Sequence, residues 1–260
     1  MVENTLPKKP FPFANIIWFV ALLIALFYSA MVSGVNFEQL FTNGYQMNSI
    51  IEMLLHPDWQ YLEYVISPLM ETIQMAILGT TFGALLALPI SFIASKNIIK
   101  NSVIRGICRF ILNIVRTIPD LLLGSLFVAV VGIGPMAGVA ALTVFSFGMI
   151  SKLFYETIET IDEGPIEAVR AVGGSTFDVI VYAVFPQIAS QLLSYTLYTF
   201  EINVRASSVL GYMGAGGIGV LLQRSLSMFR YDQTSVIIIA IFIIVFIIDF
   251  INNKVRERLI

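Results

Sequence analysis

The feature that most constrains this sequence is a series of apolar runs, each about as long as a lipid bilayer is thick. A transmembrane helix needs about 20 consecutive and mainly apolar residues. Strand-like alternation of apolar and polar residues, which is typical of a membrane β-barrel, does not occur in these runs. We therefore expect an all-α membrane protein with six transmembrane helices. The six runs cover residues 14–33, 72–94, 110–131, 136–154, 179–203 and 234–251.

The composition favours a polytopic membrane protein without chemistry of its own. Of the 260 residues, 57% are hydrophobic and 12% are charged, whereas soluble domains usually carry about twice that share of charge. The single cysteine, Cys108, and the single histidine, His56, argue against a disulfide, a metal site and a Ser-His-Asp triad. The patterns G-x-x-x-x-G-K-S/T, H-E-x-x-H and G-x-S-x-G do not occur. We expect no catalytic residue, metal or cofactor in this chain.

The distribution of lysine and arginine predicts the orientation, because cytoplasmic connections carry an excess of both. Basic residues gather before the first run, between the second and third, between the fourth and fifth, and after the sixth. They are Lys8, Lys9, Lys96, Lys100, Arg105, Arg109, Lys152, Arg170, Lys254, Arg256 and Arg258. We expect this side, and both termini, to be cytoplasmic. The outer connection 205–231 departs from the rule, because it holds Arg205, Arg224 and Arg230.

A short polar segment, 164–178, separates the fourth and fifth runs and carries its own helix signals. Gly164-Pro165 predicts the start of a short helix, and Gly173-Gly174 predicts its end through a left-handed cap. Ser175 with Asp178 three residues later predicts a capping box at the start of the next helix. The segment is therefore expected to form a short capped helix joined at a tight angle to the fifth run.

Two further features describe this short helix and the run that follows it. Ile166, Val169 and Val172 are spaced three apart and predict a small apolar edge. Pro186 removes a backbone hydrogen bond near the start of the fifth run and predicts a bend there. Caps alone do not identify a partner, so a structured loop without one is the alternative.

An ordered set of residues begins in the polar segment and continues into the fifth run. It reads Glu167-Ala168-Val169, three residues, Gly173, nine residues, Ala183, one residue, and Phe185-Pro186. This set resembles the cytoplasmic loop motif of ABC importer permeases, which is Glu-Ala-Ala, Gly and Ile-x-Leu-Pro at the same spacing. Val169, Ala183 and Phe185 depart from the usual residue types and remain apolar.

Several other stretches resemble permeases of phosphonate-type ABC importers. They are RTIPDLL (116–122), GIGPMAG (132–138), KLFYETIETID (152–162), FPQ (185–187) and FEINVRASSVLGYMGAGGIG (200–219). The resemblance covers about residues 66–259. It divides the chain into a permease core, 66–260, and a preceding part, 1–65, with an N-terminal tail, the first transmembrane helix and an outer loop.

The resemblance implies a type I ABC importer permease bundle with a cytoplasmic coupling helix at about 165–173. It implies two copies of the chain as a homodimer, two ATPase subunits that carry ATP and Mg²⁺, and an extracytoplasmic substrate-binding protein. The complex would lie in the lipid bilayer of the bacterial cytoplasmic (inner) membrane, without a nucleic-acid partner. The residues assigned to ATPase coupling are Glu167, Ala168, Arg170, Gly173 and Gly174.

Glu201, Asn203 and Arg205 form a polar group, expected near the outer end of the fifth run. Glu201 and Arg205 are four residues apart and share one side of a helix. As an ion pair they would neutralise each other near lipid. As a polar patch they would lie on the path of a small oxyanion. Both interpretations stay open.

The stretch Gly214-Ala-Gly216-Gly217-Ile-Gly219 fits the dinucleotide pattern G-x-G-x-x-G. That interpretation requires a preceding strand and an acidic residue about 20 positions later, whereas this stretch follows a membrane run. Glycines permit close backbone approach, and irregular backbone at membrane depth must be surrounded by protein or water. We therefore expect a flexible or re-entrant gate segment at Gly214, Gly216 and Gly217.

Arg116 and Asp120 lie one to two turns inside the cytoplasmic end of the third run, with Pro119 between them. One interpretation is a buried ion pair that fixes helix packing. The other is a gate element near the inner mouth of the pathway.

These features together predict the permease subunit of an ATP-driven importer that moves phosphonate, or a related small phosphorus oxyanion, inward by alternating access. A permease for another small solute, such as phosphite, phosphate or methionine, is the first alternative. An ion-driven secondary transporter would require coupling-ion sites near the midplane and usually internal repeats, which the sequence does not show. A membrane enzyme lacks a nucleophile–base pair.

Overall fold

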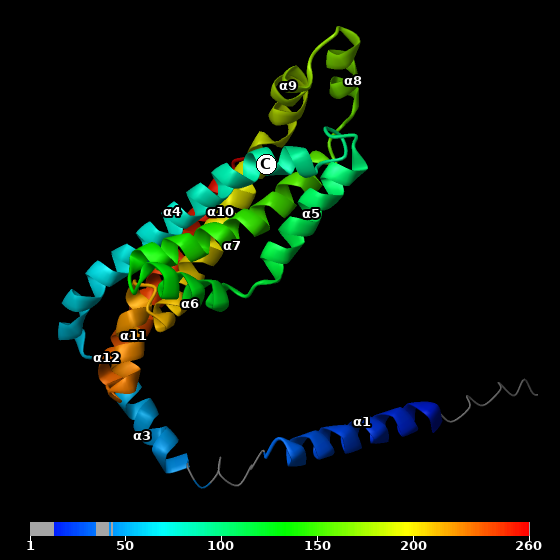
Figure 1. Ribbon diagram of the computed structural model, residues 1–260. Coiled ribbons are helices and arrows are strands. Elements are labelled where there is room, and N and C mark those ends of the chain that lie inside the picture. Colours follow the sequence, from blue (N-terminus) through cyan, green and yellow to red (C-terminus); the bar gives the residue numbers. More distant parts are fainter. Residues whose placement is uncertain (1–12, 35–41, 43, 260) are drawn as a thin grey trace, which may run out of the picture. The chain divides into compact units, whose positions relative to one another are not determined.

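The computed structural model describes residues 13–34, 42 and 44–259 (Figure 1). The chain divides into two units, residues 1–52 and 53–260. The first unit contains α1 (Phe13–Val32), an apolar helix on the first expected run. α3 (Gly44–Leu55) crosses the boundary between the units and buries no side chain.

The second unit is a helical bundle, and no strand occurs in the described part of it. Its α-helices are α4 (Leu62–Ala94), α5 (Ser102–Thr117), α6 (Asp120–Val131), α7 (Pro135–Ile158), α8 (Gly164–Ala171), α9 (Thr176–Asp178), α10 (Phe185–Leu210), α11 (Ile218–Ser227) and α12 (Tyr231–Arg256). Two 3₁₀ turns, η1 (Trp59–Tyr61) and η3 (Gly211–Met213), and a π-helix, η2 (Val179–Val184), complete it. The all-α prediction is confirmed.

Four helical segments of this unit are long and apolar enough to cross a membrane. They are residues 59–94, 135–158, 176–213 and 231–256. α5 and α6 qualify together as one broken span, and Ile16–Val32 of α1 is a shorter apolar helix. Each of the six expected runs lies on an apolar helix or helix pair of the described chain, but only four helices, or five with the broken pair, are long and apolar enough to cross a membrane.

The expectation of one continuous helix over 110–131 is wrong. α5 ends at Thr117 and α6 begins at Asp120, and the two axes are bent by 86°. The break follows from Pro119, because proline disfavours helical backbone in the residue before it. Ile118 accordingly has extended backbone, with φ −77° and ψ 120°.

The bend expected at Pro186, near the start of the fifth run, is replaced by a π-helix. The π-helix Val179–Val184 leads directly into α10, and Pro186 lies in the first turn of α10. Residues 176–213 form one candidate membrane span. Proline is tolerated in the first turn because its missing N–H would have no helical partner there, so the wider π-turn takes the place of a sharp bend.

α4 and α7 pack closely through two glycines of α4. A Cβ atom on Gly83 would lie 2.9 Å from the backbone nitrogen of Phe147, and one on Gly79 would overlap Leu142. Small residues let membrane helices approach each other. The pair fixes these two long helices side by side as the centre of the bundle.

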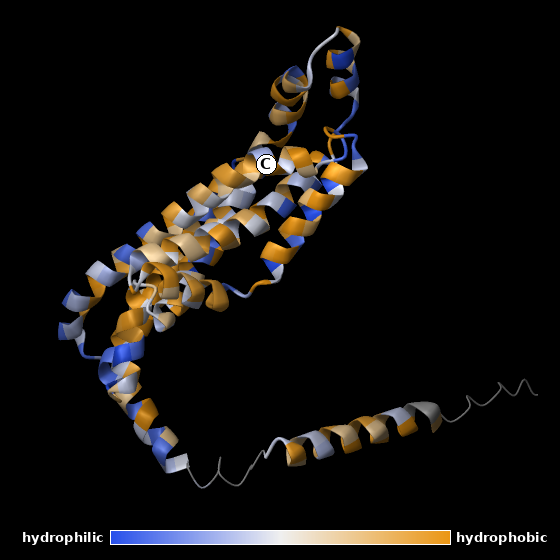
Figure 2. Cartoon of the chain, in the orientation of Figure 1, coloured by the Kyte–Doolittle hydropathy of each residue, from blue (hydrophilic) through white to orange (hydrophobic). Residues whose placement is uncertain are grey.

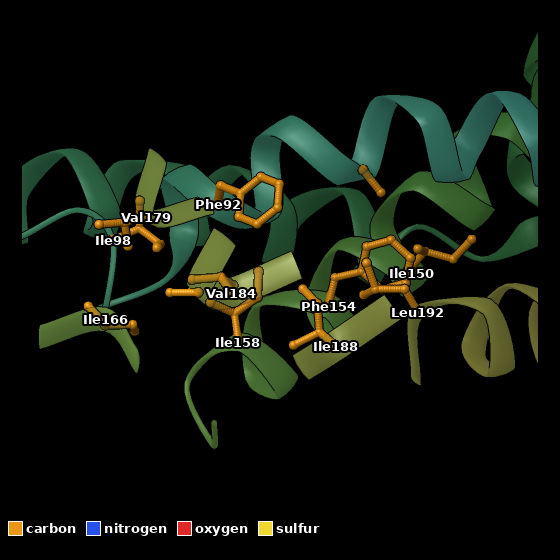
Figure 3. Packing of buried hydrophobic residues seen from close by; sticks show 12 residues of the cluster. Phe92, Ile98, Ile150, Phe154, Ile158, Ile166, Val179, Val184, Ile188 and Leu192 are labelled. Atoms are coloured by element: carbon orange, nitrogen blue, oxygen red, sulfur yellow. The ribbon is translucent and has the colours of Figure 1, made fainter. Parts of the chain in front are cut away.

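The largest buried cluster joins the long helices to the short helix α8 (Figure 3). Ile166 of α8 is 2% exposed and packs with residues of α4, α7, η2 and α10. The cluster comprises Ala87, Phe92, Ile98, Ile150, Phe154, Ile158, Ile166, Val179, Ala183, Val184, Ile188 and Leu192. α8 is therefore part of the packed bundle and not a free loop.

The bundle has two ends with different elements. α8, α9 and the C-terminal end of α12 lie at one end, which we call the α8 end (Figure 1). The start of α4 and the start of α12 meet at the other end, where the Asp58 N–H donates to the carbonyl oxygen of Asp232 at 3.2 Å. Hydrophilic residues gather toward both ends, and apolar residues cover the helices between them (Figure 2).

Candidate functional site

The short helix α8 has the ends that the sequence predicts. Pro165 lies in its first turn, and Gly173 follows it with φ +86°. The N–H groups of Gly173 and Gly174 donate to the carbonyl oxygens of Arg170 and Val169, both at 3.0 Å. These two bonds form the paired closure of a left-handed helix cap.

The start of α9 also agrees with the prediction. The Ser175 N–H donates to Asp178 Oδ2 at 2.8 Å, and the Asp178 N–H donates to Ser175 Oγ at 3.3 Å. Both halves of the capping box are present. Gly174 is confined as well, because a Cβ there would lie 2.6 Å from Val169 Cγ1. The two caps therefore fix the angle between α8 and the π-helix that follows α9.

The predicted apolar edge of α8 is only partly correct. Ile166 is buried and Val169 packs against the same cluster, but Val172 is 86% exposed. Val172 is the residue at which α8 ends, so it no longer follows the helical spacing of the other two. Glu167 and Ala168 of α8 are exposed.

Arg170 ties α8 to the connection between α4 and α5. Its Nη2 donates to the carbonyl oxygen of Asn97 at 3.1 Å, and Asn97 Nδ2 donates to the carbonyl oxygen of Ile158 at 2.9 Å. Asn97 is buried, and Ile158 ends α7. This chain of contacts connects three elements that are far apart in the sequence.

Glu159 adds a second connection at the same end of the bundle. Its Oε1 accepts a hydrogen bond from the Lys96 N–H at 2.6 Å and pairs with Arg109 of α5. Arg109 Nε also donates to the carbonyl oxygen of Ala94 at 2.8 Å. The ends of α4 and α7 and the first half of α5 are thereby held together. Neither Asn97 nor Glu159 was singled out from the sequence, because their partners lie 61 to 63 residues away.

The structure corrects the position of Glu201, Asn203 and Arg205. α10 continues to Leu210, so the three lie within the helix and not near its end. Asn203 Nδ2 donates to Thr80 Oγ1 at 2.7 Å and to Ser146 Oγ at 2.6 Å. Thr80 and Ser146 lie near the middle of α4 and α7, so Asn203 is at mid-bundle height.

Glu201 and Arg205 are brought together, but Asn203 faces away from them. Glu201 pairs with Arg205 on the next turn and with Arg256 of α12, whose Nη2 is 3.4 Å from Oε2. The Glu201 side chain is 8% exposed and that of Arg205 is 53% exposed. Asn203 is fully buried, and its Oδ1 has no hydrogen-bond partner in the described part of the chain. Arg256 was missed by sequence analysis because it lies 55 residues from Glu201.

Arg116 and Asp120 do not form the buried ion pair that was one of the two expectations. No ion pair between them is found in the described residues; they lie on opposite sides of the 86° break. Asp120 Oδ1 instead accepts a hydrogen bond from the Leu121 N–H at 2.9 Å. The aliphatic part of Arg116 lies against α7, where a Cβ on Gly148 would be 3.0 Å from Arg116 Cγ. A gate role for the two residues remains a prediction.

The glycine segment 214–219 is irregular backbone enclosed by protein. Gly216 and Gly217 have φ +84° and +72°, and both are buried. The Gly217 N–H donates to Glu71 Oε1 at 2.9 Å, and the Ile218 N–H donates to Thr72 Oγ1 at 2.8 Å. It follows a helix and not a strand, which excludes the dinucleotide fold. Glu71 and Thr72, which hold this segment on α4, carry no signal in the sequence that could have predicted the contact.

A bundle of membrane-length helices with a short capped helix packed at one end is the architecture of a polytopic membrane protein. Residues 79–260 match the family described as "Binding-protein-dependent transport system inner membrane component". The chain belongs to this family, the permease subunits of ABC importers, and is a multi-pass protein of the inner membrane.

Two relatives and one solved structure show the range of similarity. The phosphite transport system permease protein PtxC of Stutzerimonas stutzeri is 38% identical over 202 residues, 78% of this chain and 74% of that protein. A putative cryptic phosphonate transport system permease protein of Escherichia coli (strain K12) is 41% identical over 120 residues, 46% of this chain and 98% of that protein.

The solved structure is a chain of the MetNI methionine ABC transporter in an inward-facing conformation. It aligns with a TM-score of 0.68 and 24% identity, covering 75% of this chain and 96% of that one. This similarity confirms the fold of a type I ABC importer permease.

Proposed function

We propose that this chain is the permease subunit of an ATP-driven importer for phosphonate or a related small phosphorus oxyanion. The names of its relatives support this substrate class, since one is a phosphite and one a phosphonate permease. Its proposed partners are a second copy of the chain, two ATPase subunits that hold ATP and Mg²⁺, and an extracytoplasmic substrate-binding protein. The chain itself contributes no catalytic residue, and both termini face the cytoplasm.

The anchoring of α8 is the observation that carries this proposal. Glu167 and Ala168 are exposed and free to meet an ATPase groove, while Ile166 and Arg170 on the same helix are fixed to the bundle. A force on α8 therefore reaches α4 through Asn97 and α7 through Ile158. ATP binding would close the ATPase dimer and move the two copies of α8, so that the long helices change the side to which the pathway opens.

The charges around Glu201 support an anionic substrate. One carboxylate, Glu201, lies between two guanidinium groups, Arg205 and Arg256, which leaves one positive charge in excess. An uncompensated charge at membrane depth is costly, so an anion is favoured there. Arg205 is half-exposed and has donors to spare, whereas Arg256 keeps Glu201 paired. We assign Arg205 to the anion and Glu201, Asn203 and Arg256 to its support.

Gates would lie above and below this group. Gly214, Gly216 and Gly217 form the outer segment, because they pack irregular backbone against α4 and the start of α7. Arg116 and Asp120 flank the break between α5 and α6, which is the element best able to change angle near the inner mouth.

Reconstitution of the complete transporter tests this function. In proteoliposomes with binding protein outside and ATP inside, we expect saturable uptake of radiolabelled methylphosphonate or phosphite, and none of methionine. The same assay with Glu167→Ala should show intact permease and reduced uptake. Uptake of methionine in place of both phosphorus compounds would refute the substrate class, and uptake without ATP would refute the transporter class.

A further inference from the structure

A cavity of about 350 Å³ lies at the end of the bundle opposite α8, and the transport mechanism described above does not use it. It is formed where the starts of α4 and α12 meet α11. Its walls are Tyr61, Tyr64, Leu221, Arg224, Ser225, Met228, Arg230 and Gln233. We call it the Arg224–Arg230 cavity. It contains the two other arginines, besides Arg205, that depart from the expected distribution of basic residues.

The walls of this cavity are basic. None of its lining residues is acidic. Arg224 has no carboxylate within 4.0 Å in the described part of the chain, and the ion pair of Arg230 with Asp232 Oδ2 is long, at 3.9 Å, and half-exposed. Exposed pairs of this kind contribute little to stability. Both guanidinium groups therefore keep donors that an added anion can use.

The backbone of Arg230, on the rim of the cavity, is held by hydrogen bonds to residues of α11 and α12. The Arg230 N–H donates to the carbonyl oxygen of Ser225 at 2.9 Å, and the Arg230 carbonyl oxygen accepts from the Thr234 N–H at 3.0 Å and Thr234 Oγ1 at 2.9 Å. Thr234 Oγ1 and Ser225 Oγ also lie 2.9 Å apart, and both residues are buried. The C-terminal end of α11 and the start of α12 are thus held as one piece.

This turn also contains an unusual backbone conformation. Phe229 has φ +55°, whereas all other described residues with positive φ are glycines. Its N–H donates to the carbonyl oxygen of Leu226 at 3.1 Å, so Phe229 takes the left-handed position that glycine usually takes after a helix. That conformation is strained for a residue with a side chain. The strain is localised directly beside Arg230, on the rim of the cavity.

The donors around the cavity fit a small phosphorus oxyanion. Two guanidinium groups can each donate a forked pair of hydrogen bonds to such a group. The lining also includes Tyr61, Tyr64 and Gln233, residues whose side chains carry hydroxyl and amide donors. Since a water molecule occupies about 30 Å³, the cavity has room for a five-atom oxyanion with part of its hydration shell.

We propose that the Arg224–Arg230 cavity is an oxyanion-binding site for a phosphate, phosphite or phosphonate group. This inference rests on the proposed function for its substrate class. The group can come from the free transported anion or from a phospholipid headgroup at the membrane surface, since both present the same oxygens. The site is separate from Arg205, which lies on α10.

Equilibrium dialysis tests the site without transport. The permease–ATPase complex, in nanodiscs and without binding protein, is titrated with radiolabelled inorganic phosphate. We expect Arg224→Gln/Arg230→Gln to weaken the binding at least 10-fold, or to remove one bound phosphate per permease chain. Arg258→Gln, which removes an exposed arginine near the C-terminus, is the matched control and should bind as wild type. Arg224→Lys/Arg230→Lys retains the charge without the fork and should bind with intermediate affinity.

Two lipid compositions distinguish the sources of the group. Binding of equal strength in phospholipid and in phosphate-free glycolipid nanodiscs supports the free anion as ligand. Binding that appears only in glycolipid nanodiscs supports a lipid headgroup as the occupant. Phosphate binding that is unchanged by the double glutamine variant in both lipids would overturn the site. Each of these results is obtained whether or not the transporter imports phosphorus compounds, so the two proposals can fail separately.

Discussion

Arg256 Nη2 lies 3.4 Å from Glu201 Oε2, and the two residues are separated by 55 positions in the chain. The contact connects the last turn of α12 to the interior of α10. Because Glu201 also pairs with Arg205, its carboxylate keeps one partner when the other leaves. Loss of Arg205 therefore leaves Glu201 paired with Arg256, so that an effect on transport can be distinguished from an effect on folding.

Replacement of Arg205 should therefore abolish uptake and leave the complex intact. In Arg205→Ala, Glu201 stays paired with Arg256, so we expect wild-type assembly with the ATPase and a large loss of oxyanion uptake. Arg205→Ala/Arg256→Ala leaves a buried carboxylate without a partner, which costs about 3–5 kcal/mol in a fully buried site. Thermal unfolding of the purified complexes measures this difference, with Arg258→Ala as control. A destabilised Arg205→Ala protein that transports normally would assign the pair to structure alone.

Gly173→Val should misplace α8 without unfolding the bundle. A Cβ at Gly173 meets no atom within 4 Å, so the substitution causes no steric clash with neighbouring residues. The penalty comes from the backbone, because a β-branched residue at φ +86° costs about 1–3 kcal/mol. We expect reduced uptake and an ATPase activity that no longer responds to liganded binding protein. Gly106→Val is the matched control, since Gly106 also has open space around it and lies in an ordinary helix. Wild-type uptake and stimulation in Gly173→Val would refute the coupling role of α8.

Asn97→Ala should uncouple ATP hydrolysis from uptake. It removes the donor to the Ile158 carbonyl oxygen, and leaving a buried group unpaired costs about 1–3 kcal/mol. We expect α8 still to dock, so that co-purification with the ATPase is unchanged while fewer substrate molecules are imported per ATP. The control is Lys100→Ala. Lys100 lines the same cavity as Asn97 and is exposed, so this variant should behave as wild type. Loss of ATPase binding in Asn97→Ala would show that Asn97 serves docking and not transmission.

Single cysteines should report opposite sides of the membrane at the two ends of the bundle. In a Cys108→Ser background, Lys100→Cys at the α8 end should be labelled from the cytoplasm by a membrane-impermeant maleimide. Ser227→Cys at the end of α11 should be labelled from outside. Both native residues are exposed. Labelling of the two positions from the same side would contradict the predicted topology.

Phe229→Gly should stabilise the turn between α11 and α12. Glycine adopts positive φ without the steric penalty, and Phe229 is 74% exposed, so the main packing lost is the edge contact of its ring with Tyr231. We expect the free energy of unfolding of this region to rise by about 1 kcal/mol, measured as slower hydrogen exchange at the start of α12. Phe177→Gly, another exposed phenylalanine with ordinary backbone, is the control and should not be stabilised. Faster exchange in Phe229→Gly would mean that the ring supports the turn.

The sequence alone determined the features that depend on neighbours along the chain. The membrane helices follow from apolar runs of bilayer length, and the ends of α8 and α9 follow from Pro165, Gly173 and the Ser175–Asp178 box. These signals are reliable because the hydrogen bonds of a helix cap join residues only three to five positions apart in the sequence. The prediction that Val172 belongs to the apolar edge of α8 was wrong because α8 ends at Ala171, one residue earlier.

Tertiary structure decided everything that depends on how the helices lie against one another. The height of Asn203 is set by Thr80 and Ser146, and the partners of Glu201 and Arg170 come from α12 and from the 95–101 connection. No local pattern predicts such contacts, because the register between two helices is fixed by glycine contacts such as Gly83 with α7. The Arg224–Arg230 cavity arose in the same way. Its arginines were visible in the sequence as an exception, but only the packing of α4, α11 and α12 placed them around one space.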